Sequence, residues 1–416
     1  MEESVWKMRN FYEMIREQEA DRLALVEEGK EYTYGELVKL SQEQGNRLRQ
    51  ENSEKKVIFF RKKRILDQLV SFLGCQAAGK IPLLVPEDAK QLPEIGEVPE
   101  NACMAVMTSG STGVPKVLYR RYESWADFFP EQNRVFGVDD KTVIFCQGSL
   151  AFTGNLNIYM GVLAAGGTLI VTQRFRPRHW LELMAEHGVN AIYLIPSKLL
   201  LLTKFMREAN TRVRSIISGS QSMGRVEADK LLEVFPEAEI TLYYGASELN
   251  YITYIKDSEM TDDRTLIGRP FAGVQVSVVD EEIFIDTPYH VEAISLPFSL
   301  KDRGRLDAEG RLHFLGRTDD ILSVNGRKVS AVKVSRALMD LPDVEEAAVL
   351  VVHVDDADVL TAFVGAVQEY SKQQLVKLLR ASLEDYELPK QFIFLPELPH
   401  NESGKVDKAA LKRLLG

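Results

Sequence analysis

The 416-residue sequence has few of the residues that build cross-linked or metal-held proteins. It contains three cysteines, Cys75, Cys103 and Cys146, with no CxxC pair, which excludes a disulfide framework and a zinc site of that spacing. Its six histidines form no HExxH motif, so no structural metal is expected. No apolar run approaches the length of a membrane span. Together with an acidic N-terminal segment that lacks an apolar signal core, these absences favour a cytoplasmic protein.

Basic residues are outnumbered by acidic ones. The chain has 51 Lys and Arg against 61 Asp and Glu, a formal net charge of -10. A nucleic-acid-binding protein usually carries a basic balance or a continuous basic stripe. The local cluster at residues 61–64 is predicted to be a solvated face. We therefore expect no nucleic-acid partner.

What the sequence does contain is an alternation of strand-like and helix-like patterns. Residues 56–60, 142–146 and 168–172 predict strands, and a helical pattern begins at about Tyr34. This alternation indicates a parallel α/β sheet. The segments RSIISGS and ITLYYGASE predict strands that end in polar turns. In such sheets, sites form at the carboxyl ends of strands, where both turns lie.

The length of the chain and a change in the sequence pattern near Gly268 predict more than one domain. Short β-rich pieces over about 268–317 suggest a β subdomain that completes an N-terminal domain at 1–317. Residues 318–330 are predicted to form a polar linker. The remainder predicts a helix at 331–339, strands at 347–354 and 360–368, a helix at 372–385, a strand at 392–395 and a final helix. Residues 318–416 are thus expected to form a compact α+β domain.

The segment MTSGSTGVPKVLYR, residues 107–120, carries the chemistry of a phosphate cradle. Glycines let main-chain N–H groups approach a ligand, and consecutive N–H groups form an anion nest. Hydroxyl side chains add donors, and Lys116 adds a positive charge suited to phosphate. The spacing does not fit GxxxxGK[ST], which excludes a Walker loop. A lone GSTG would be typical of a surface turn, so the assignment depends on motifs downstream.

Those motifs resemble the adenylate-forming superfamily of acyl-CoA synthetases, peptide-synthetase adenylation domains and firefly luciferase. TSGSTGVPK resembles its phosphate loop, and YYGASE resembles its YGxTE motif with Ser247 in the threonine place. The other matches, in the family's order, are YTYGEL, IGRPFAGVQVSVVD, DRGRLDAEGRLHFLGRTDD and PHNESGKVDKAAL. Any one motif is weak, whereas their order along nearly the whole chain is specific. The resemblance implies a large N-terminal domain of α/β sheets with a β subdomain, and a small mobile α+β C-terminal domain.

The resemblance also implies a two-step reaction with ATP, Mg²⁺ and coenzyme A. A carboxylate attacks the α-phosphorus of ATP and gives acyl-AMP and pyrophosphate, and a thiol then displaces AMP. Charge neutralisation on the phosphoryl oxygens is the main requirement of the first step. The implied β- and γ-phosphate ligands are Thr108, Ser109, Gly110, Ser111, Thr112, Gly113 and Lys116.

Further roles are implied by position in the motifs. Glu248 would bind Mg²⁺, since a hard cation prefers a carboxylate oxygen. Ser247 would touch the α-phosphate or the acyl oxygen, and Lys405 would bridge the carboxylate and the α-phosphate. The remaining implied assignments are Tyr244, Gly245, Ser218, Gly219 and Ser220 near the adenine, Asp302 on the ribose hydroxyls, Arg317 beside it, and Asp319 as the hinge.

Several positions depart from the family pattern. Leu300 and Lys301 replace the first two residues of a TGD triplet, and Ser323 replaces the linker lysine. The segment SAVKVSRAL lacks the family's carboxylates after the linker. About twenty residues separate LLVPED from the phosphate loop, which is too short for another βαβ unit. Thr153 stands where amino-acid-activating domains carry an aspartate, and this argues against an α-amino acid, whose buried ammonium would lack a charge partner.

Three functional readings stay open at this stage. The leading one is a carboxylate–CoA ligase for a fatty or aryl acid. The pocket for this acid would be lined by residues 152–156, 195–199, 218–222 and 243–246. The second is an acyl-AMP ligase that loads a carrier protein, because Arg327 and Lys328 suit CoA phosphates and an acidic carrier equally. The third is a degenerate homologue that binds nucleotide without turnover, motivated by the altered triplet and the missing linker lysine. Retention of Lys116, Glu248, Arg317 and Lys405 speaks against the third.

Overall fold

The computed structural model describes residues 9–51, 54–87, 89, 92–108, 116–317, 320–324, 327–354, 357–366, 370–400 and 406–415. Contacts divide the chain into two compact units. The first comprises Met1–Val276 and Ile285–Phe298, and the second comprises Ser277–Phe284 and Ser299–Gly416. Within the described ranges, no helix has both the length and the apolar character needed to cross a membrane.

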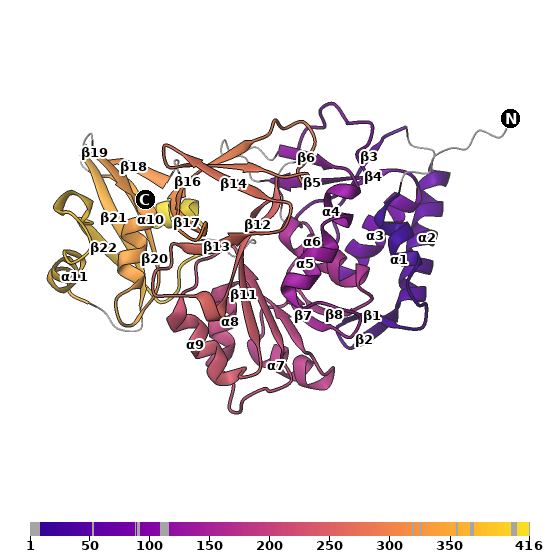
Figure 1. Ribbon diagram of the computed structural model, residues 1–416, viewed down its shortest axis with the longest axis horizontal. Helices are drawn as coiled ribbons and strands as arrows, with labels where there is room; N and C mark the ends of the chain where they lie inside the picture. The colour runs from indigo at the N-terminus through magenta and orange to yellow at the C-terminus, as the bar shows by residue number, and fades with distance from the viewer. Residues whose placement is uncertain are drawn as a thin grey trace. The chain divides into compact units, whose positions relative to one another are not determined.

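A long mixed sheet forms the centre of the first unit (Figure 1). Its strands within this unit follow the order β13-β12-β11-β10-β9-β7-β8-β1-β2. The pairs β7–β8, β7–β9, β9–β10 and β10–β11 are all parallel, so the loops that follow these strands leave from one edge. The strands are β1 (Leu23–Glu27), β2 (Lys30–Thr33), β7 (Val143–Gln147), β8 (Thr168–Thr172), β9 (Ala191–Tyr193), β10 (Ser215–Gly219), β11 (Glu239–Ala246), β12 (Asn250–Lys256) and β13 (Leu266–Pro270).

A second sheet of the same unit has the order β3-β4-β5-β6, with the last strand antiparallel to its neighbour. Its strands are β3 (Val57–Phe60), β4 (Ile81–Leu84), β5 (Met104–Thr108) and β6 (Lys116–Arg120). The helices of the unit are α1 (Phe11–Arg16), α2 (Tyr34–Gln50), α3 (Ile65–Ala77), α4 (Glu123–Ala126), α5 (Phe129–Phe136), α6 (Thr153–Ala164), α7 (Pro177–Glu186), α8 (Pro196–Thr203) and α9 (Arg225–Val234), with a 3-10 turn at Asp257–Glu259.

Helix α2 illustrates how local sequence sets an element. Thr33 and Glu36 form a capping box, which starts the helix at Tyr34, as the sequence predicts. The helix packs closely on α3 through Gly45 and Gly74. A Cβ atom on Gly45 would lie 2.9 Å from the Gly74 carbonyl oxygen, and one on Gly74 would lie 2.7 Å from the Ser41 carbonyl oxygen. Only glycine at both positions permits this distance between the two backbones.

The second unit contains a three-stranded sheet of order β20-β21-β22 and a separate pair, β18–β19. Its core joins the inner faces of α10 and α11 to this sheet. The elements are β16 (Phe298–Leu306), β17 (Leu312–Arg317), β18 (Ile321–Val324), β19 (Arg327–Ser330), α10 (Ala331–Met339), β20 (Val344–Val354), β21 (Ala357–Ala366), α11 (Lys372–Leu379), a 3-10 turn at Asp385–Glu387, β22 (Gln391–Leu395) and α12 (Lys408–Arg413). Strands β14 (Gln275–Val279) and β15 (Glu282–Asp286) span the division between the units.

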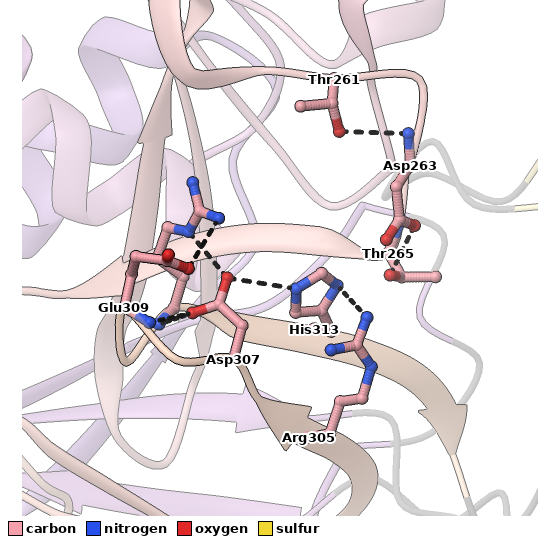
Figure 2. A network of polar contacts seen from close by, with 8 residues as sticks. Thr261, Asp263, Thr265, Arg305, Asp307, Glu309 and His313 are labelled. Carbon is pink, nitrogen blue, oxygen red and sulfur yellow. Dashed lines mark hydrogen bonds and ion pairs between the residues drawn. The ribbon is translucent and has the colours of Figure 1, made fainter.

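The β16–β17 hairpin is held by a polar network at its turn (Figure 2). The Asp307 carboxylate accepts hydrogen bonds from the backbone N–H and the side chain of Arg311, both at 2.8 Å. His313 lies 3.5 Å from the same carboxylate and contacts Arg305 at 3.2 Å through its other ring nitrogen. The hydrogen bonds and positive charge of Arg311 lower the pKa of Asp307 to about 2 against the opposing effect of desolvation. This network is local to the hairpin and fixes its turn.

The α/β fold class expected from the sequence is confirmed. The expected helix at 331–339 matches α10, whereas the helix expected at 372–385 is wrong in its second half, because α11 ends at Leu379. After α11 the chain turns so that Leu383 is buried in the core and the buried Glu387 pairs with Lys333. These tertiary contacts outweigh the helical pattern of the sequence. A domain boundary at residues 317/318 stays a prediction.

Substitution of Glu27 by alanine is expected to destabilise the first unit. The Glu27 carboxylate, only 4% exposed, accepts the N–H groups of Ile65 at 2.7 Å and Leu66 at 3.0 Å at the start of α3. Losing this cap leaves buried donors unpaired, which costs about 1–3 kcal/mol in the free energy of unfolding. Urea titration of wild type and variant measures the loss. The exposed Glu31 provides a control, and an equal loss in Glu31→Ala would contradict the capping role.

Candidate active site

The β5–β6 pair frames the predicted phosphate loop. Thr108 and Lys116 are direct partners in the antiparallel register, so the two ends of the loop lie opposite each other. Lys116 is exposed. The predicted ligands between them, Ser109, Gly110, Ser111, Thr112 and Gly113, lie outside the described residues. Thr108 and Lys116 thus flank the predicted loop, and their contact with phosphate stays a prediction.

The turn from β11 into β12 carries four predicted site residues. Tyr244 and Gly245 lie in the last three residues of β11, which ends at Ala246, and Ser247 and Glu248 follow in the turn. The Ser247 hydroxyl donates to Thr153 Oγ1 at 3.0 Å, at the start of α6. The Glu248 carbonyl oxygen accepts the N–H of Val291 at 2.8 Å. The half-buried Glu248 carboxylate makes no recorded hydrogen bond or ion pair with any described residue, so it is available to a ligand.

The predicted adenine turn follows β10. Ser218 is fully buried, and its hydroxyl donates to the carbonyl oxygen of Leu194 at 2.7 Å. This hydroxyl therefore joins β10 to the residue that follows β9. Gly219 is buried, and Ser220 is exposed with a left-handed φ of 67°. Contact of this turn with a nucleotide stays a prediction.

The segments predicted to line the pocket for the acid meet at the same edge of the sheet. A Cβ on Gly154 would lie 3.1 Å from the Tyr193 hydroxyl and 3.5 Å from the Tyr243 hydroxyl. These two hydroxyls are hydrogen-bonded to each other at 2.9 Å. The Ser197 N–H donates to Gln221 Oε1 at 3.0 Å, which joins two further predicted segments. Burial raises the pKa of Tyr243 to about 12, so its hydroxyl is a neutral group near pH 7.

The second unit holds the predicted ribose aspartate. Asp302 is 5% exposed, and one of its carboxylate oxygens lies 3.2 Å from Arg317 Nε, so the two predicted residues are brought together. Lys301, which stands where the family's TGD triplet has glycine, adopts a left-handed φ of 62°, a conformation that glycine reaches without strain. The strand β16 therefore contains a left-handed residue directly before Asp302. The predicted Lys405 and the predicted hinge Asp319 lie outside the described residues.

Arg120 is a site residue that the sequence analysis missed. It ends β6, is fully buried, and donates from Nη2 to the carbonyl oxygen of Ser247 at 2.7 Å. Burial lowers the pKa of Arg120 to about 9, and the negative charge of Glu248 opposes that shift. The sequence signal that could have identified Arg120 is a charged residue at the end of a largely apolar strand just after the phosphate loop.

The residues present fit a magnesium–nucleotide complex. Mg²⁺ usually binds one or two protein carboxylates together with substrate phosphates and water. Glu248 offers one such carboxylate, whereas the described residues contain no cluster of three or more His, Cys, Asp or Glu side chains that would hold a metal alone. Lys116 and Arg120 supply positive charge on the strand that follows the phosphate loop. This donor set suits a metal held jointly by protein and polyphosphate.

Replacing Gly219 by alanine is expected to disturb this edge of the sheet. The new Cβ would lie 2.5–2.8 Å from three ring atoms of Tyr243, whose hydroxyl is held by Tyr193. Because the ring is buried on all sides, relief of the clash costs about 1–3 kcal/mol. Thermal unfolding and ATP binding measure the effect. Gly96→Ala, with nothing within 4 Å of its Cβ, is the control, and equal behaviour of both variants would contradict the packing described.

Two family models match the sequence. Residues 84–285 match the AMP-binding enzyme model, and residues 333–405 match the AMP-binding enzyme C-terminal domain. Together these ranges include the β11–β12 turn, the phosphate loop and the segment around Lys405.

Comparison with curated proteins and solved structures gives the same result. The chain is 25% identical over 344 residues to an uncharacterized acyl–CoA ligase, YhfT, of Bacillus subtilis (79% of this chain, 71% of the relative). It is 26% identical over 343 residues to D-alanine–D-alanyl carrier protein ligase of Lactococcus lactis (74% and 68%). The fold matches o-succinylbenzoate CoA synthetase (MenE) from Bacillus subtilis with a TM-score of 0.82 at 18% identity, covering 97% of this chain and 98% of that one. The sequence motifs, the fold and both family models agree that the chain belongs to the adenylate-forming family of AMP-binding enzymes.

Proposed function

We propose that the chain is an ATP-dependent carboxylate–CoA ligase that forms an acyl-adenylate and transfers the acyl group to the CoA thiol. The observation that carries this proposal is the β11–β12 turn. It presents the available Glu248 carboxylate beside the Ser247 hydroxyl, and buried Arg120 holds the Ser247 backbone. An acyl–CoA ligase name among the relatives supports the same activity.

The proposed roles divide between binding nucleotide and neutralising charge. Thr108, Lys116 and the loop between them hold the β- and γ-phosphates, and Glu248 holds Mg²⁺, which supplies charge neutralisation on the phosphoryl oxygens when bound. Ser247 orients the α-phosphate or acyl oxygen. Tyr244 and the turn at 218–221 contact the adenine. In the second unit, Asp302 accepts the ribose hydroxyls with Arg317 beside it, and Lys405 bridges the reacting carboxylate and α-phosphate.

The acid is proposed to be a fatty or aryl acid without an α-amino group. Thr153 presents a hydroxyl, held at 3.0 Å by Ser247, where a carboxylate would be needed to pair with an ammonium. The segments around Gly154, Tyr193 and Tyr243 offer aromatic rings and neutral hydroxyls. These groups suit an apolar or aromatic acyl group with few charges.

The thiol acceptor is proposed to be CoA, and a carrier protein is the second candidate. A carrier-protein ligase among the relatives favours the second candidate. Arg327 and Lys328 are both exposed on β19, where positive charge suits the phosphates of CoA or an acidic carrier. Arg327 also lies over the ring of Tyr386 at 5.2 Å, which gives its guanidinium a fixed support.

Pyrophosphate release from Mg-ATP across a panel of carboxylic acids tests this function. We expect acid-dependent release that CoA accelerates, together with acyl-CoA detected by mass spectrometry. Lys405→Ala should abolish most release but spare thioester formation from supplied acyl-AMP, because the lysine serves only the first step. Equal loss of both steps would refute that role.

Two other outcomes of the panel decide between the candidates. Release without an acyl-CoA product would favour a carrier-protein acceptor. Binding of ATP without release for any acid would favour a nucleotide-binding homologue that does not turn over.

Asp319→Pro is expected to slow the thiol step more than adenylation. The family resemblance makes Asp319 a hinge, and proline fixes φ near −65°, which restricts rotation there. Single-turnover measurement of acyl-AMP formation and of its consumption by CoA separates the two steps. An unchanged second step would remove the hinge assignment.

A further inference from the structure

Arg120 is a buried cation that makes no ion pair at contact distance in the described part of the chain, and Glu248 is the negative charge that acts on it from farther away. Its side chain is fully buried, and no carboxylate of the described residues is recorded within ion-pairing distance of its guanidinium. Its Nε atom has no hydrogen-bond partner among those residues. Burying an unpaired charge costs several kcal/mol, and a neutral residue of similar shape would satisfy packing alone at lower cost. The position therefore carries a charge that the fold by itself does not require.

The guanidinium connects three segments at one point. Nη2 donates to the Ser247 carbonyl oxygen at 2.7 Å, and Nη1 donates to the Tyr289 carbonyl oxygen at 3.0 Å and to Ser124 Oγ at 3.2 Å. The indole of Trp125 lies beneath it, with its ring centroid 5.5 Å from the guanidinium carbon. Arg120 thus joins the strand that continues from the phosphate loop to the turn that carries Glu248.

Backbone hydrogen bonds reinforce the same connection. The N–H of Val291 donates to the Glu248 carbonyl oxygen, and the N–H of Glu292 donates to the Tyr119 carbonyl oxygen, both at 2.8 Å. The segment around Tyr289 therefore bridges β6 and the β11–β12 turn on both sides of Arg120. The Arg120 guanidinium brings a positive charge into hydrogen-bonding contact with the backbone of this turn. Its field acts on Glu248, the charge that opposes the lowering of the arginine's pKa.

We infer that Arg120 is a positioning residue for the nucleotide step: it fixes the Ser247–Glu248 turn against β6 and offsets the negative charge gathered there when Mg-ATP binds. The inference rests on the proposed function. Because the side chain is fully buried, it acts through Ser247 and Glu248 and does not touch the ligand. Preorganised positive charge in a site that excludes water stabilises developing phosphoryl charge most strongly.

Arg121 provides a matched control on the neighbouring position. It also binds the 288–292 segment, through the Pro288 carbonyl oxygen at 3.0 Å and Glu292 at 3.3 Å. It makes no recorded contact with the Ser247–Glu248 turn among the described residues, and its side chain is 30% exposed. Loss of Arg121 therefore weakens the bridge without removing the buried charge.

The test compares Arg120→Met, Arg120→Lys and Arg121→Met with wild type. Calorimetry with Mg-ATP, and with ATP in EDTA, measures magnesium-dependent binding without any acid. We expect Arg120→Met to weaken Mg-ATP binding about 10- to 100-fold, since small misplacement of site groups has effects of that size. Arg120→Lys should recover part of the loss, because it keeps the charge but not the three directed hydrogen bonds. Arg121→Met should stay within about threefold of wild type.

A merely structural role would give a different pattern. It would lower the melting temperature and reduce pyrophosphate release and CoA transfer from supplied acyl-AMP by the same factor. We expect the transfer step to be spared and the KM for Mg-ATP to rise while the KM for the acid stays unchanged. Should Arg120→Met not fold, the Arg120→Lys and Arg121→Met pair decides the matter by the same measurements.

The outcomes separate the inference from the proposed function. The inference would be overturned if Arg120→Met and Arg120→Lys bound Mg-ATP with the same affinity as Arg121→Met. Wild-type protein that binds Mg-ATP but releases no pyrophosphate would refute the ligase, and the binding data would still decide the role of Arg120. Wild-type protein that does not bind Mg-ATP would overturn both.

Discussion

Parallel pairing of β7, β9, β10 and β11 is the constraint on which the candidate site depends. In a parallel sheet every strand ends at the same edge, so polar turns far apart in the sequence meet there. Tyr193 at the end of β9 and Tyr243 near the end of β11 come within hydrogen-bonding distance in this way. The start of α6 approaches the same edge through Gly154 and Thr153. The register of the strands, and not any single side chain, places these groups together.

Charge at this edge is distributed between buried and accessible groups. Glu248 is half-buried and available, Lys116 is exposed, and Arg120 lies fully inside. A polyphosphate with Mg²⁺ brings charges of both signs, and a binding site must offset both. The accessible groups can contact the ligand, while the buried arginine sets the potential and geometry of the turn. This division explains why a costly buried cation lies near a carboxylate that makes no hydrogen bond or ion pair at contact distance among the described residues.

Departures from the family motifs have local structural explanations. Lys301 has the left-handed backbone that glycine favours, and the next residue of β16, Asp302, pairs with Arg317. Thr153 lacks the carboxylate that amino-acid-activating domains carry at this position, and its hydroxyl accepts a hydrogen bond from Ser247. In both cases the backbone conformation or a hydrogen bond accommodates the different residue type.

The sequence by itself determined the α/β fold class, the start of α2 at Tyr34, the span of α10 and the family to which the chain belongs. These features depend on local periodicity, on caps such as Thr33 and Glu36, and on motifs whose letters are read directly. The end of α11 and the role of Arg120 were decided only by the tertiary structure. Burial of Leu383 and Glu387 stopped the helix. Two of the partners of Arg120, Ser247 and Tyr289, are more than 100 residues away in the sequence. Such long-range contacts leave no periodic signal, because their energy arises only when distant segments have been brought together by the sheet.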